Sequence, residues 1–304
     1  MNILVLGAGA TGGYYGARLL QAGADVTFLV RPSRKVQLQR DGLTVRGELG
    51  DFAGPVRTIT RDELKSPFDL VVVSCKGYDL ESAINDIEPA VGPRTGVLPW
   101  LNGLAPYDRL DDAFGRDRVL GGVAYVATAL QPDGVITQQG RQDKVIVGAR
   151  TTLLQPLASR FHQLLPKTPG ERLLSTDIEQ ALWDKWVMLC AGAAMNCLMR
   201  GSVADILRTD GGHGLMEGTI AECLEVASRE GHALSESTVS LIHARLLDTK
   251  STWAASMMRD IAAGVPRLET ETIVGDMVRR ASAHLMTAPL LRAAYCHLQV
   301  YGLR

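Results

Sequence analysis

The sequence predicts a doubly wound α/β domain with a parallel sheet, followed by a smaller all-α domain. Three observations predict this fold. A glycine-rich turn joins an apolar strand to a helix at the start of the chain, strands and helices alternate through the first half, and only helical periodicity appears from Thr176 onward. The character changes at Pro166–Gly170, so we place the domains at residues 1–170 and 171–304.

The first strand and its turn form a dinucleotide-binding pattern of the Rossmann type. Ile3–Leu6 is an apolar run typical of a strand buried on both faces, and it enters a Gly-x-Gly-x-x-Gly turn. The first glycine permits the tight turn, the second leaves the backbone open to a pyrophosphate, and the third allows close helix packing. The alternative is a glycine turn that only packs tightly. The candidate cofactor-binding residues here are Gly7, Ala8, Gly9, Ala10, Thr11 and Gly12.

The second strand, Asp25–Val30, ends in a basic segment where an NAD enzyme would carry an acid for the ribose hydroxyls. Arg31, Arg34 and Lys35 follow instead, with Ser33 among them. Guanidinium groups pair well with a 2′-phosphate, so the segment favours NADP(H) over NAD(H). A solvated basic loop is the alternative.

The next strands lead to a second cofactor-side candidate. Gly42–Val45 and Val56–Ile59 are predicted as short strands separated by glycine turns, and Asp69–Ser74 as a buried parallel strand. Lys76 follows at the carboxyl edge, where open α/β sheets bind ligands. It is a candidate for cofactor binding, with an exposed surface lysine as the alternative.

A further strand brings an asparagine to the same edge. After a helix at Asp79–Ile87, the strand Gly96–Leu101 ends in Asn102, which suits a nicotinamide or substrate carbonyl as well as it suits a simple Asn-Gly turn. Val119–Ala129 and Lys144–Val147 are then expected to close the sheet.

The C-terminal half is predicted to be helical throughout. Leu182–Met199 is very apolar, but Asp184 and Lys185 lie within it, so it indicates a buried core helix and not a membrane span. The predicted helices are Asp177–Leu198, Leu215–Glu230, Ser235–Leu247, Thr252–Ala263 and Glu269–His284.

Composition excludes several classes of function. The net charge of −1 argues against nucleic acid or an anionic membrane as the main partner. The first strand starts the chain, so we expect no leader peptide and a cytoplasmic protein. The five cysteines and six histidines show no metal-ligand spacing, which predicts reduced thiols and no metal site.

Three residues of the helical half are candidates for chemistry. Lys185 lies between Trp183 and Trp186, and a lysine drawn into a partly dry cleft changes its pKa and can donate a proton. The alternative is a lysine that reaches the surface beside its neighbour. Glu269 is either a site acid or a favourable helix start, and Ser256 is either a ligand or a plain helix residue.

The chain resembles the ketopantoate reductase (2-dehydropantoate 2-reductase) family over nearly its whole length. The lysine helix and the acidic segment that ends in two arginines are specific when they occur together. The matching segments are GAGATG at Gly7–Gly12, VRPSR at Val30–Arg34, SCKGYD at Ser74–Asp79, LNG at Leu101–Gly103, LWDKW at Leu182–Trp186, REGHALS at Arg229–Ser235, SMMRDI at Ser256–Ile261 and LETETIVGDMVRRASAH at Leu268–His284.

The resemblance implies NADPH-dependent reduction of a small branched 2-oxo acid, ketopantoate, to the (R)-2-hydroxy acid in a cleft between the domains, as a step of pantothenate biosynthesis. By that similarity Lys185 donates the proton and Glu269 holds the substrate hydroxyl or the cofactor across the cleft. Ser256 is implied to contact substrate and Asn102 to bridge cofactor and substrate. The remaining implied NADP ligands are Arg31 and Lys76.

One departure leaves the substrate open. The family usually carries asparagines at the positions of Leu189 and Ala193, and Asn196 lies a further turn along the helix. A more apolar 2-oxo acid is therefore an alternative substrate. A non-catalytic NADP(H) sensor is a third hypothesis. The apolar residues of the helical half fit either a homodimer interface or the core of the domain.

Overall fold

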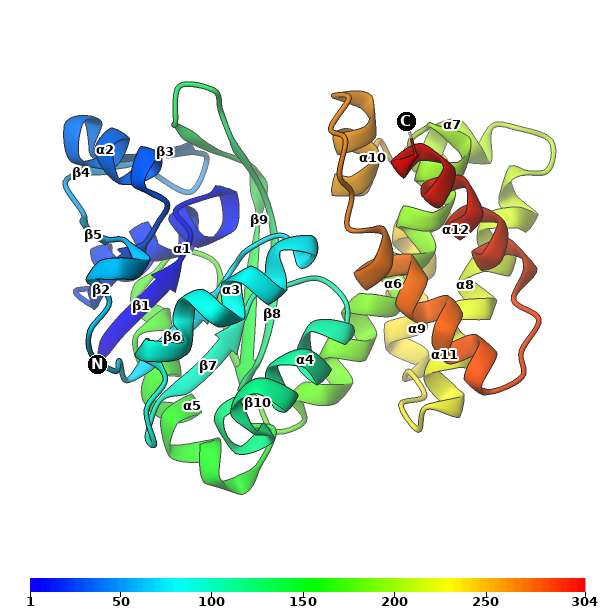
Figure 1. Ribbon diagram of the computed structural model, residues 1–304. Coiled ribbons are helices and arrows are strands. Elements are labelled where there is room, and N and C mark those ends of the chain that lie inside the picture. The colour runs from blue at the N-terminus through cyan, green and yellow to red at the C-terminus, as the bar shows by residue number, and fades with distance from the viewer. Residues whose placement is uncertain (304) are drawn as a thin grey trace. The chain divides into compact units, whose positions relative to one another are not determined.

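The chain divides into an α/β unit and a helical unit, as the sequence predicts (Figure 1). The computed structural model describes residues 1–303. The first unit contains residues 1–101 and 106–181, and the second contains residues 102–105 together with those from 182 onward. The division between the units therefore passes through one long helix, and the short segment after Leu101 belongs to the helical unit.

The first sheet is parallel and carries the glycine turn. Its apolar central strands are buried on both faces, which explains their continuous hydrophobic sequence. Pro99 is tolerated because its strand lies at the edge of the sheet. In spatial order the strands are β5 (Arg57–Ile59), β2 (Asp25–Leu29), β1 (Asn2–Leu6), β6 (Leu70–Val73) and β7 (Gly96–Pro99).

A second sheet replaces the expected closure of the first. The expectation that Val119–Ala129 and Lys144–Val147 complete the first sheet was wrong, because the chain makes one parallel bridge there, Val97 with Val119, and then leaves. Apolar patterning indicates a strand but not its partner. The strands are β10 (Glu171–Ser175), β9 (Ile136–Gly148), β3 (Leu43–Gly47) and β4 (Phe52–Gly54) in spatial order, with β8 (Gly121–Leu130) paired to β9.

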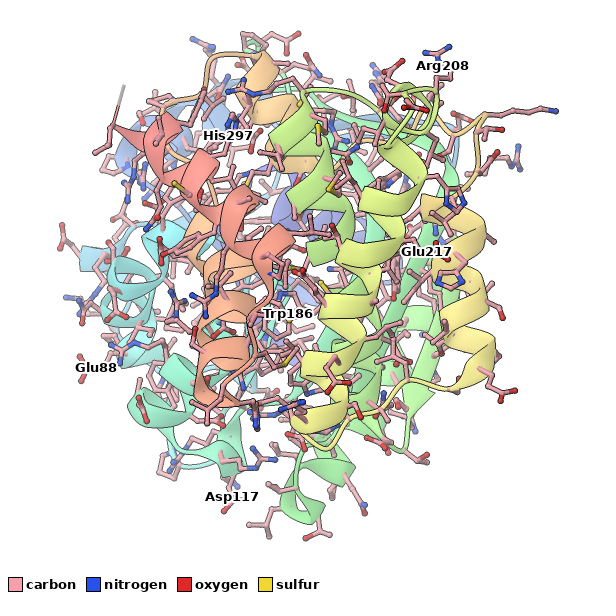
Figure 2. All side chains as sticks on the ribbon, turned by 90° about the vertical axis from the view of Figure 1, so that its right-hand side faces the viewer. Glu88, Asp117, Trp186, Arg208, Glu217 and His297 are labelled. Carbon is pink, nitrogen blue, oxygen red and sulfur yellow. The ribbon has the colours of Figure 1, made fainter. Side chains whose placement is uncertain are left out.

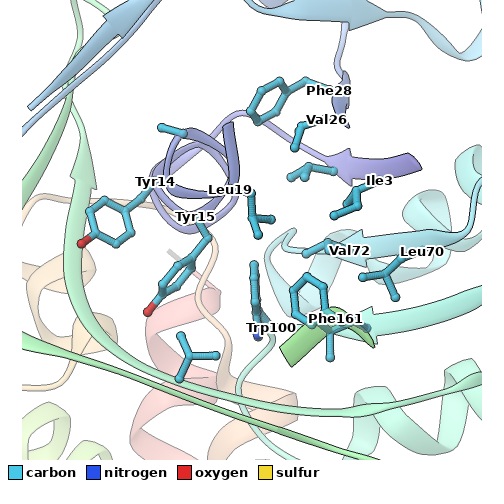
Figure 3. Packing of buried hydrophobic residues seen from close by; sticks show 14 of the residues in the cluster. Ile3, Tyr14, Tyr15, Leu19, Val26, Phe28, Leu70, Val72, Trp100 and Phe161 are labelled. Carbon is cyan, nitrogen blue, oxygen red and sulfur yellow. The ribbon is translucent and has the colours of Figure 1, made fainter. Parts of the chain in front are cut away.

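Helix α1 (Ala10–Gln21) lies between the two sheets. Toward the first sheet, Gly16 leaves room for the ring of Phe28, which a Cβ would approach to 2.4 Å. Toward the second, the hydroxyls of Tyr14 and Tyr15 donate to the buried carboxylate of Asp143. Figure 3 shows both tyrosines projecting from this helix within the apolar cluster. The helix that follows the glycine turn is thus anchored on both sides.

The other helices of the first unit form the connections between successive strands. The basic segment is the start of a helix and not a loop, because Pro32 occupies the first helical position, where its fixed φ is favourable. These helices are α2 (Pro32–Asp41), α3 (Leu80–Ile87), α4 (Ala105–Phe114, which starts in the segment assigned to the second unit) and α5 (Gln155–His162).

The second unit is built around α6 (Ile178–Met199), which is apolar on all sides and therefore suited to a central position. Figure 2 shows Trp186 of this helix among the surrounding helices, with Arg208 and Glu217 at the outer surface. None of the helices described between residues 1 and 303 is sufficiently long and apolar to traverse a bilayer. The others are α7 (Val203–Leu207), α8 (Gly212–Arg229), α9 (Glu236–Leu246), α10 (Ser256–Ala262), the π-helical η7 (Glu271–Gly275), α11 (Asp276–Ala283) and α12 (Pro289–Gly302).

Candidate functional site

The glycine turn between β1 and α1 has the shape of a phosphate cradle. Gly7 has a φ of +89°, a backbone angle that residues other than glycine rarely adopt. A Cβ at Gly12 would lie 2.1 Å from the hydroxyl oxygen of Ser74, so the helix can approach the sheet only with glycine there. A Cβ at Gly9 would meet no atom within 4 Å, which leaves open space beside the backbone. The turn thus fits a pyrophosphate at a helix N-terminus.

The start of α1 adds a positive electrostatic end to this cradle. Ala10 and Thr11 begin the helix, and its first turn contains no acidic residue that would neutralise the free N–H groups. The carbonyl of Ala8 accepts a hydrogen bond from the guanidinium of Arg34 at 3.0 Å. These N–H groups are therefore available to an anion while the turn itself is braced from α2.

The three cations after β2 have different surroundings. Arg34 donates hydrogen bonds to the carbonyls of Ala8 and Gly134, and Lys35 forms an ion pair with Glu63. The side chain of Arg31 remains 82% exposed, 3.6 Å from a carboxylate oxygen of Asp79. Sequence spacing did not reveal either acid near the basic segment, because each arrives from a distant part of the chain. Arg31 is the cation of this group with most freedom to reach a ligand.

Lys76 lies at the carboxyl end of β6, next to the glycine turn. β6 pairs with β1 in parallel, so the residues that follow Leu6 and Val73 leave neighbouring strand ends. Ser74, which touches Gly12 in this arrangement, donates its hydroxyl to the carbonyl of Leu6 at 2.9 Å. The expected cofactor-side placement of Lys76 is consistent with this position.

In the second unit, Lys185 and Asn102 meet. The ammonium of Lys185, on α6, donates a hydrogen bond to the side-chain oxygen of Asn102 at 3.0 Å. Burial lowers the pKa of Lys185 to about 8, and the negative charge of Glu269 works against that change. Glu269 itself is only 6% exposed. The structure therefore brings three of the predicted site residues together, with Asn102 and Glu269 acting on the ammonium of Lys185.

Ser256 is placed on a separate element, as the first residue of α10. The backbone just before Ser256 is held by the fully buried Asn196, whose amide oxygen accepts a hydrogen bond from the N–H of Ala255 at 3.1 Å. The amide nitrogen of Asn196 donates to the carbonyl of Gly201 at 2.8 Å. Asn196 lies one turn beyond the positions where the family carries its asparagines. Both ends of its amide are engaged within the protein, so it has a structural role.

The helix face beyond Lys185 is apolar. Leu189 is 8% exposed and Ala193 is fully buried. Gly192 lies against the indole of Trp253, which a Cβ at that glycine would approach to 2.5 Å. Sequence reasoning had no signal for Trp253, because periodicity does not indicate which distant side chain covers a helix face.

Comparisons with known proteins agree with this geometry. The family model described as ketopantoate reductase PanE/ApbA matches residues 3–151, and the model of its C-terminal domain matches residues 177–302. The uncharacterized oxidoreductase YkpB of Bacillus subtilis is 31% identical, with 99% of each chain covered. The structure of 2-dehydropantoate 2-reductase from Geobacter metallireducens superposes with a TM-score of 0.88 at 26% identity, covering 99% of each chain.

D-mandelate dehydrogenase, solved with NADH and anilino(oxo)acetate, superposes with a TM-score of 0.87 over 99% of this chain and 98% of its own. Its identity of 19% makes this a likeness of fold. The two family models together match residues in both units, and the relatives span the chain almost from end to end. The protein is therefore an oxidoreductase of the ketopantoate reductase PanE/ApbA family.

Proposed function

We propose that the protein reduces 2-dehydropantoate to (R)-pantoate with NADPH, a step of pantothenate biosynthesis. The observation that carries the proposal is the partly buried ammonium of Lys185, bonded to Asn102 and coupled electrostatically to the buried Glu269. A carbonyl reduction needs a positive proton donor already in place where negative charge develops. This group of three residues meets that requirement.

The glycine cradle and the basic segment support NADP(H) as the cofactor. The open space at Gly9 accommodates a pyrophosphate, and Lys76 follows the neighbouring strand. The segment that follows β2 in the chain, residues 30–35, contains no acidic residue, and the exposed guanidinium of Arg31 suits the 2′-phosphate. Binding would require Arg31 to exchange its contact with Asp79 for the phosphate.

The proton transfer follows from the surroundings of Lys185. When bound, the reduced nicotinamide supplies a hydride to the carbonyl carbon of the 2-oxo acid. Lys185 gives one proton from Nζ to the carbonyl oxygen, so the product is the neutral 2-hydroxyl group. A pKa of about 8 keeps the ammonium charged at neutral pH and makes it a better proton donor than an ordinary lysine. Asn102 orients the ammonium through its side-chain oxygen, and Glu269 favours the charged form.

A second candidate substrate is a more apolar branched 2-oxo acid. Leu189 and Ala193 present no polar atoms beyond the backbone, and the amide of Asn196 is already bonded to Gly201 and Ala255. A helix face without donors for the substrate hydroxyl weakens discrimination in favour of the hydroxylated acid. This observation favours a substrate such as 3-methyl-2-oxobutanoate, which lacks that hydroxyl.

The test is NADPH oxidation with 2-dehydropantoate and with 3-methyl-2-oxobutanoate, using the wild-type protein, Lys185→Ala and the control Lys250→Ala. Lys250 is an exposed lysine of the same unit. We expect turnover that Lys185→Ala abolishes without weakening NADPH binding, and that Lys250→Ala leaves unchanged. A kcat/KM far higher for 2-dehydropantoate would exclude the apolar alternative, and the reverse would exclude 2-dehydropantoate as the main substrate. Absence of turnover with any 2-oxo acid would favour the non-catalytic NADP(H) sensor.

A further inference from the structure

A π-helical turn begins two residues after Glu269. This segment, η7 (Glu271–Gly275), is wider than an α-helix, and such single π-turns occur frequently at functional sites. It is tied to the candidate acid, because the N–H of Ile273 donates to the carbonyl of Glu269 at 3.2 Å and the Thr272 hydroxyl donates to the same oxygen at 3.3 Å. The position of η7 therefore determines where the backbone of Glu269 lies.

Trp186 connects this segment to the catalytic candidate on α6. It follows Lys185 directly in the chain and is only 1% exposed. Its indole N–H donates to the carbonyl of Ile273 at 3.0 Å. A buried indole N–H requires an acceptor, and a bond in a dry interior holds its two partners firmly in register. One hydrogen bond thus joins the helix of Lys185 to the segment of Glu269.

The loop that carries Asn102 docks on the same segment. Gly103 has a φ of +85°, and a Cβ on it would lie 2.0 Å from the carbonyl oxygen of Thr272. Only glycine therefore permits this approach between the two backbones. Since Asn102 precedes Gly103 directly, the segment sets the position of the amide that receives the hydrogen bond from Lys185.

The ring of Trp186 is also held from another side. The guanidinium of Arg280, on α11, lies 5.6 Å from the ring centroids of both Trp186 and Trp183, and the two indoles are 5.1 Å apart. Arg280 is itself bonded to Glu230 at 2.6 Å. Stacking on a guanidinium fixes the ring plane. The N–H of Trp186 is therefore aimed at η7 by contacts that do not involve Lys185.

We propose that Trp186 is a positioning residue, whose indole N–H holds Lys185 at its working distance from Glu269 by fastening α6 to the π-helical segment. The inference rests on the proposed function for its effect on catalysis, while the placement of Lys185 can be measured without turnover. Of the charged side chains on and beside these elements, Glu269 is the one whose charge raises the pKa of Lys185. The others on α6, η7 and α11 are Glu179, Asp184, Glu271, Asp276, Arg279 and Arg280.

The test compares Trp186→Phe with Trp183→Phe. Trp186→Phe keeps an aromatic ring but removes the N–H that is donated to Ile273. Trp183→Phe is the matched control, because Trp183 is on the same helix and its ring also lies against Arg280. Steady-state kinetics, NADPH affinity and NMR titration of ¹³C-labelled lysine are measured for both. For Trp186→Phe we expect kcat to fall roughly tenfold with KM and NADPH affinity nearly unchanged, because a small displacement of a catalytic group affects the chemical step.

We also expect the titration midpoint of Lys185 to fall in Trp186→Phe, because the ammonium moves away from Glu269, and to stay constant in Trp183→Phe. Equal losses of kcat in both variants, or a Lys185 midpoint that stays constant or rises in Trp186→Phe, would overturn the inference. If the wild-type protein reduces no 2-oxo acid, the proposed function fails, and the NMR titration alone still decides whether Trp186 positions Lys185.

Discussion

Replacing Lys185 by methionine should abolish activity and stabilise the protein at neutral pH. The ordinary pKa of lysine is 10.5, and burial lowers that of Lys185 to about 8 even with Glu269 favouring the charged form. At about 1.4 kcal/mol for each pH unit between these values, the partly buried charge lowers the free energy of unfolding by at most about 3 kcal/mol. Methionine has a similar length and no charge, so Lys185→Met should recover most of that amount.

The pH dependence identifies the cause. Below about pH 8 the lysine is charged in the folded and the unfolded protein, so the whole difference between variant and wild type is present. Between about 8 and 10.5 the folded protein loses this proton before the unfolded chain does, and the difference shrinks toward zero. Differential scanning calorimetry across this range measures it, with Lys250→Met as the exposed control. A destabilised Lys185→Met protein, or a gap that stays constant up to pH 10.5, would refute the reasoning.

The remaining predictions concern the cofactor site, the core and the substrate. Gly9→Ala should fold with an unchanged Tm, because its Cβ meets open space, and should lose about tenfold in NADPH affinity. Full NADPH affinity in that variant would place the pyrophosphate elsewhere. Arg31→Ala should weaken NADPH binding much more than NADH binding, as isothermal calorimetry can measure, and equal effects would remove Arg31 from the 2′-phosphate site. Asp143→Asn should reduce the free energy of unfolding by about 3 kcal/mol in urea titrations, because it leaves the guanidinium of Arg172, 2% exposed, without its counter-charge. An unchanged urea midpoint would show that this ion pair is not needed. Leu189→Asn should shift the kcat/KM ratio toward 2-dehydropantoate relative to 3-methyl-2-oxobutanoate, and an unchanged ratio would separate this helix face from the substrate.

Sequence reasoning predicted the elements of the fold better than their pairing. Continuous apolar runs such as β1 and β6 are detectable because buried parallel strands need them, and the glycine spacing identifies the turn that follows. The second sheet was missed as a separate layer, because β9 and β10 pair through backbone groups that no residue pattern specifies. The helix α12 was not predicted for a related reason. Pro289 at its first position is a start signal, but the preceding Ala288 is in the left-handed region and offers no side-chain cap.

Residue patterns alone gave the candidate site only as separate residues, and the family resemblance supplied the expectation that they meet. Lys185 and Glu269 were recognised through family motifs, and Asn102 through its place after a strand, but their grouping depends on contacts far apart in the chain. In the basic segment, neighbouring residues that were predicted to act together have different partners. Three adjacent cations suggested one anion site, whereas Lys35 is paired with an acid and Arg34 with carbonyls. A charge pattern in sequence cannot reveal partners that arrive from other elements.

The spacing along α6 connects these points to substrate choice. Lys185, Leu189, Gly192 and Asn196 follow one another at intervals of four, three and four residues, which places them along one helix face. Gly192 is covered by an indole ring, and Asn196 is the next polar side chain on this face after Lys185. The amide of Asn196 is bonded to Gly201 and Ala255, so it cannot turn toward a substrate without breaking buried hydrogen bonds. Any polar contact to a substrate hydroxyl must therefore come from another element, such as Ser256 on α10. If kinetics show strong preference for 2-dehydropantoate, that element becomes the place to look for the missing donor.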